Sequence, residues 1–83
     1  MDLRAVLESE TIWIEDLRDM LQQLKCDSTG SRSELIDRIM NHCRSKRSIL
    51  DPLDLWKLKD LCRRFNLESW GSKEDLVRRL AES

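Results

Sequence analysis

The sequence predicts an all-α fold, in which two tandem helix-turn-helix units pack into one small helical domain. Two patterns predict it: apolar residues recur at spacings of three and four, and part of the chain repeats at an offset of 41 residues. The composition agrees, since two glycines, one proline and no tyrosine leave few residues for hairpins or aromatic strands. At 83 residues, the chain is too short for a large enzyme with a deep cleft.

The repeat places Gly30 on Gly71, and the match extends well beyond the glycine. Residues 17–40 lie over residues 58–81 without a gap. Seven positions are identical: Leu17/Leu58, Asp19/Asp60, Ser28/Ser69, Gly30/Gly71, Ser31/Ser72, Leu35/Leu76 and Arg38/Arg79. The apolar rhythm and the turn stay aligned together, which indicates an internal duplication.

Each unit begins with an amphipathic helix, because its apolar residues form one stripe. These residues are Ile14, Leu17, Met20, Leu21 and Leu24 in the first unit, and Leu55, Leu58, Leu61, Cys62 and Phe65 in the second. A short polar connection with a glycine then turns the chain. The second helix opens with a serine N-cap and an acidic residue three positions later, Ser31 with Glu34 and Ser72 with Asp75.

These signals divide the chain into four segments. Residues 1–13 form an N-terminal segment in which Leu3, Val6 and Leu7 have the spacing of a further short helix. Residues 14–43 are the first unit, residues 44–51 a basic linker and residues 52–83 the second unit. Asp51 and Pro52 are predicted as N-cap and first residue of a helix. Because units this small bury little surface alone, we expect them to pack together or to share the N-terminal helix.

The two units resemble the SAP domain family, a helix-extended-loop-helix module. The resemblance lies in residues 14–39 and 58–80, where the pattern glycine, any residue, Arg or Lys, two residues and leucine occurs twice in register. It implies binding of double-stranded DNA, often in chromatin, repair or RNA-processing proteins. The family's basic residue after the glycine matches Arg32 and Lys73. The family usually has a glycine where this chain has Lys25 and Asn66.

The residues themselves also predict a phosphate site at the start of each second helix. Free backbone N–H groups and the positive end of the helix dipole favour an anion there, and Arg32 or Lys73 adds a full charge. On a helical wheel, further basic residues lie on one flank of each first helix. The candidate DNA-binding residues are Arg18, Lys25, Gly30, Ser31, Arg32, Lys59, Arg63, Gly71, Ser72 and Lys73. Contacts to phosphate imply steep salt dependence and little sequence preference.

Charge favours the first unit as the DNA-binding one. The whole chain has a net charge of −1, so only a local patch can attract nucleic acid. Six basic and three acidic residues fall in 21–50, whereas 51–83 has seven of each. The alternative is a helical protein-protein interaction module without nucleic-acid binding, using the apolar N-terminal residues or a surface with Trp56 and Trp70.

Tryptophan 70, in the connecting turn, is open to two interpretations. An aromatic ring there could stack on a sugar or base or insert into a partner, but a tryptophan beside a turn more often closes the edge of the local core. Packing is therefore the favoured interpretation. Trp13 and Trp56, near the starts of the first helices, are predicted to pack as well, with Trp56 the better candidate for contact between units.

No catalytic residue, metal, cofactor or small-molecule substrate is predicted. His42 and the three cysteines lack the paired spacing of a zinc site, and no nucleotide-binding loop or nucleophile motif occurs. Cys26 and Cys62 align with Leu67 and Leu21, which predicts core thiols. No segment has the length of a membrane span or the order of a signal peptide, so an intracellular protein is expected, and a nuclear one, by the resemblance, in a eukaryote.

Overall fold

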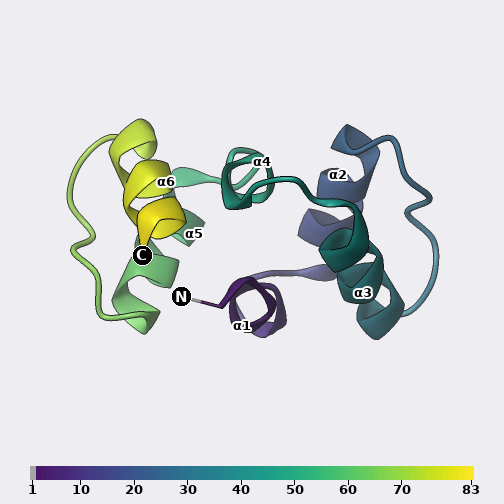
Figure 1. Cartoon of the computed structure of the whole chain (residues 1–83). Coiled ribbons are helices and arrows are strands. Elements are labelled where there is room, and N and C mark those ends of the chain that lie inside the picture. Colours follow the sequence, from purple (N-terminus) through teal and green to yellow (C-terminus); the bar gives the residue numbers. More distant parts are fainter. Residues whose placement is uncertain (1) are drawn as a thin grey trace.

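The computed structural model describes residues 2–83, and over that range all regular secondary structure is helical, which confirms the predicted all-α class. The helices are α1 (Leu3–Glu8), α2 (Ile14–Gln23), α3 (Arg32–His42), α4 (Lys46–Leu50), α5 (Leu55–Arg64) and α6 (Lys73–Glu82). They form an elongated body with extents of 34 × 20 × 19 Å (Figure 1).

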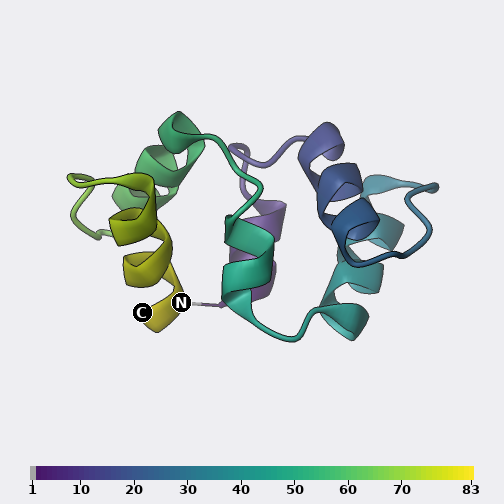
Figure 2. The same ribbon diagram turned by 90° about the horizontal axis from the view of Figure 1, so that it is seen from above.

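Each unit, together with the short helix that precedes it, forms a group of three packed helices. Helix α2 packs on α3, and α5 packs on α6. Helix α1 packs on α3, just as α4 packs on α6, so the two short helices occupy matching places. In Figures 1 and 2, α1 and α4 lie in the middle of the molecule, with α2 and α3 to one side and α5 and α6 to the other.

The segment expected to be a linker, residues 44–51, therefore contains helix α4. Ser45 caps this helix by accepting from the backbone N–H of Ser48, and Ile49 and Leu50 are buried. The sequence analysis missed this helix because the segment is short and basic and contributes only two apolar residues to the helix, too few to show a helical spacing.

The prediction that Asp51 and Pro52 begin the next helix is wrong. Asp51 instead ends α4, donating its N–H to the carbonyl oxygen of Arg47, and the N–H of Leu53 reaches the carbonyl oxygen of Leu50. Pro52 thus lies in a tight turn, which suits its fixed φ angle. Helix α5 begins three residues later, at Leu55, with Asp54 as its N-cap.

Helices α2 and α5 end in the same hydrogen-bonded motif. The N–H of Cys26 bonds to the carbonyl oxygen of Leu21, as that of Leu67 bonds to Cys62. This is the Schellman arrangement, which requires a left-handed residue just beyond the helix. Lys25 and Asn66 occupy that place, with φ of 62° and 60°. The geometry explains why the SAP pattern has a glycine at these two positions.

The two units meet at positions that are equivalent in the repeat. Lys57, nearly fully buried, forms an ion pair with Asp16, and these two residues are 41 positions apart. The ion pair therefore joins the two units at the same position of the repeat. Beside this pair, the rings of Trp13 and Trp56 lie 5.7 Å apart, so both tryptophans are at the contact between units, as expected.

A single hydrophobic core joins the units. Its buried residues come from all six helices and from the connections that contain Ile12 and Leu53. Further polar contacts cross between the units: Thr11 donates to Asp60, and Arg64 lies 3.9 Å from Glu10. The units thus pack together in one domain, as the sequence predicted.

Candidate nucleic-acid interface

An extended loop joins the two helices of each unit, and the two loops lie at opposite ends of the molecule (Figures 1 and 2). We call residues 24–31 the first loop and residues 65–72 the second loop. Each loop carries the chain from the end of one helix back to the start of the next. The predicted cations at the ends of one loop, Lys25 and Arg32, are therefore separated by its length.

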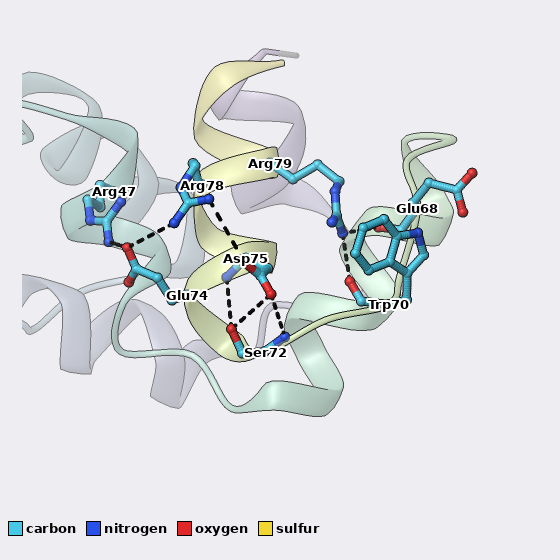
Figure 3. A network of polar contacts seen from close by, with 8 residues as sticks. All are labelled: Arg47, Glu68, Trp70, Ser72, Glu74, Asp75, Arg78 and Arg79. Atoms are coloured by element: carbon cyan, nitrogen blue, oxygen red, sulfur yellow. Dashed lines mark hydrogen bonds and ion pairs between the residues drawn. The ribbon is translucent and has the colours of Figure 1, made fainter.

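One arginine holds each loop in place. The Nη1 atom of Arg38 donates to the carbonyl oxygens of Asp27 and Thr29, at 2.8 Å each. Arg79 makes the equivalent bonds, at 2.7 Å to Glu68 and 2.9 Å to Trp70 (Figure 3). These two loop arginines were not among the predicted site residues. Their identity at matching positions of the repeat was the available signal, because it persists on an otherwise variable polar face.

The glycine before each second helix has the backbone conformation that the turn needs. Gly30 and Gly71 have φ of 119° and 112°, a region that other residues rarely adopt. A β-carbon at Gly71 would also lie 2.9 Å from the side chain of Asp75. Both glycines therefore act through the backbone.

The predicted capping boxes at Ser31 and Ser72 are present, and they occupy part of each helix N-terminus. The N–H of Ser72 donates to the Asp75 carboxylate at 3.0 Å, and that of Ser31 donates to Glu34 at the same distance. These bonds lower the pKa values of Asp75 and Glu34. An incoming phosphate would thus find the next two N–H groups of each helix, and not those of the serines.

Most of the predicted basic residues have no acidic partner. Among residues 2–83, the acid-paired cations include Arg4, Arg47, Lys57, Arg64 and Arg78. The predicted cations Arg18, Lys25, Lys59, Arg63 and Lys73 form no salt bridge with any described residue. All of these except Lys59 are exposed, and Lys59 is half-buried. An unpaired surface cation keeps its charge available to phosphate.

Arg32 differs from the other predicted cations. Its half-buried side chain donates to the carbonyl oxygens of Leu7 and Ser9, at 3.0 and 3.2 Å. These oxygens lie at the end of α1, where a helix leaves carbonyl groups without internal partners. Arg32 therefore holds α1 against the start of α3, whereas its counterpart Lys73 is exposed and forms no such bond.

The prediction that Trp70 closes the edge of the local core is wrong. The Trp70 side chain is 64% exposed. One face of its ring is covered by the guanidinium of Arg79, whose central carbon lies 4.5 Å from the ring centroid (Figure 3). The core beneath the second loop is closed by smaller residues, among them Leu67, which packs against the buried cluster.

The cysteines predicted to be core thiols lie in the core or against it. Cys62 is buried, where desolvation raises the pKa of its thiol, and Cys26 is half-buried against the core. Within residues 2–83, no three His, Cys, Asp or Glu side chains are grouped to hold a metal ion. None of the helices described is both long enough and apolar enough to cross a membrane.

The geometry defines each unit as a helix-extended-loop-helix module. Residues 57–83, which lie in the second unit, match the model of the SAP domain family, and this match supports the resemblance drawn from the sequence. SAP domains are generally DNA-binding modules and are not a catalytic family, and they occur mostly in nuclear proteins. No curated protein and no solved structure matches the chain significantly.

Proposed function

We propose that the chain binds the backbone of double-stranded DNA with little sequence preference, chiefly through its second unit. The observation that carries this proposal is whether the basic residue two positions after each turn glycine is free to contact phosphate. Lys73 is exposed and unpaired, whereas Arg32 is bound to α1. The family match, which covers the second unit, supports the same choice. This replaces the preference for the first unit, which rested on net charge alone.

Within the second unit, Lys73, Lys59 and Arg63 supply the charge, and Gly71 and Ser72 shape the turn. Arg63 lies one helical turn after Lys59 on α5. The remaining predicted residues, Arg18, Lys25, Gly30, Ser31 and Arg32, form the corresponding surface of the first unit and play the smaller part in this proposal. For a eukaryotic source, this function fits a nuclear, chromatin-associated location.

The units themselves supply a matched test, because Lys59 and Arg18 occupy equivalent positions and both lack an acidic partner. Binding of a fluorescent duplex is measured by anisotropy at about 50 and 200 mM salt, where phosphate contacts weaken most visibly. We expect micromolar binding at the lower salt, weakened by more than about tenfold at the higher. Lys59→Glu and Lys73→Glu should each weaken binding by about tenfold, and Arg18→Glu by about twofold.

Two outcomes contradict this proposal. Equal losses from Arg18→Glu and Lys59→Glu would assign binding to both units alike. Absence of salt-dependent binding would instead favour the protein-interaction alternative. That alternative is supported by three exposed apolar side chains, Trp13, Leu55 and Trp56, which are 53%, 43% and 51% exposed.

A further inference from the structure

The second loop carries an exposed aromatic ring that its own fold does not require. The first loop has Thr29 at the position of Trp70, yet Arg38 binds the Thr29 carbonyl oxygen as Arg79 binds that of Trp70. Both turns also have a glycine with positive φ and a serine-capped helix after it. The loop therefore forms equally well with a small polar side chain, and stability does not explain the tryptophan.

The Trp70 ring is held in one orientation with one face open. Arg79 covers the other face and also bonds to the Trp70 carbonyl oxygen, at 2.9 Å, so the guanidinium restrains both ring and backbone. In Figure 3 the Glu68 carboxylate points away from this stack. The ring is 64% exposed and therefore accessible to a flat ligand. Because Arg79 already restrains it, the ring loses little mobility when a ligand stacks on it.

The ring stands directly before the turn at which Lys73 is proposed to contact phosphate. Only Gly71 and Ser72 separate the two residues. A ligand that offers both an anion and a flat apolar face to these groups is a nucleotide, through its phosphate and its base.

We propose that Trp70 stacks on an unpaired base beside the phosphate bound at Lys73, so that the chain prefers DNA containing a single-stranded gap. In a paired duplex each base is covered by its neighbours, and inserting a ring costs a few kcal/mol per step. A base in a gap has already lost its pairing and offers its face. This inference rests on the proposed DNA binding and adds a preference among DNA structures.

The test compares one duplex with the same duplex carrying a gap of about four nucleotides, the lower end of a small single-strand site. Binding of both labelled DNAs is measured by anisotropy at one low salt concentration. We expect the gapped DNA to bind about 5- to 100-fold more tightly, the range that base-aromatic stacking supplies. Trp70→Thr should abolish this preference and change binding of the paired duplex by less than about twofold, whereas Trp70→Phe should retain part of it.

The first loop shows that Trp70→Thr suits this backbone, and circular dichroism checks that the variant folds. A second readout uses Trp13→Phe with Trp56→Phe, which leaves Trp70 as the only tryptophan. Its emission should be quenched by gapped DNA. Equal affinity for both DNAs, a preference that survives Trp70→Thr, or unchanged emission on binding each overturns the inference while DNA binding itself stands. If the wild-type chain binds neither DNA, the proposed function fails, and this inference fails with it.

Discussion

At the residue scale, the two loop arginines are the side chains on which the extended loops depend most. Arg79→Met keeps the apolar stem and removes two charge-assisted bonds to loop carbonyl oxygens, so we expect the free energy of unfolding to fall by about 1–2 kcal/mol. Arg78→Met is the matched control, since Arg78 has only exposed ion pairs at 3.9 and 4.0 Å. It should cost less than about 0.5 kcal/mol. Urea unfolding measures both, and equal losses would show that Arg79 does not hold the loop.

A second prediction at this scale concerns the left-handed residues that end α2 and α5. Lys25 has φ of 62°, which is strained for a lysine, so Lys25→Gly should raise the free energy of unfolding by about 0.5–1 kcal/mol. Asn66→Gly should give a smaller gain, because asparagine tolerates this conformation better. Lys25→Ala keeps the strain and controls for loss of the charge. A gain from Lys25→Ala equal to that from Lys25→Gly would exclude strain as the cause.

At the scale of elements, the sequence predicted the helix boundaries that have a strong local motif and missed those that depend on contacts within the folded molecule. The serine capping boxes mark the starts of α3 and α6 correctly, because a cap bonds to residues three positions away. Helix α4 and the true start of α5 were missed. Ser45 marks the start of α4 with a local cap, but the helix has only two apolar residues. Ile49, Leu50 and the following Leu53 are identified as core residues only by their burial in the folded molecule.

The candidate site divides in the same way. The cations without acidic partners could be named from their positions on a helix, but the bonds that engage Arg32 could not. They depend on α1, which the repeat does not include and which packs on α3 through the fold. The exposure of Trp70 is likewise a property of the assembled loop, since sequence position alone favoured burial.

The capping boxes also make stability depend on pH. The folded-state pKa values of Asp75 and Glu34 are held below their ordinary values of 3.8 and 4.5 by the serine N–H groups. Their contribution is therefore complete above those ordinary values and is lost as the pH falls through the lower folded-state values. The double variant Asp75→Asn with Glu34→Gln should lose less stability between about pH 6 and pH 2 than the wild type. Unfolding in urea across this range measures it, and parallel curves would contradict the assignment.

At the scale of the whole molecule, the buried Lys57–Asp16 ion pair couples the two units. Lys57→Met would leave the Asp16 carboxylate without its cation, in a site where that side chain is only 17% exposed, so we expect a loss of about 3 kcal/mol. Arg64→Met removes only exposed ion pairs and should cost less than about 1 kcal/mol.

A double variant of the same pair tests whether the two units are energetically coupled. Asp16→Asn keeps an acceptor for the Trp13 N–H and removes the charge, so the double variant with Lys57→Met should be more stable than the sum of the two single losses implies. Because one core joins the units, circular dichroism and tryptophan emission should report one transition in the wild type. Additive losses together with two separate transitions would mean that the repeats fold independently and that the Lys57–Asp16 contact is incidental to stability.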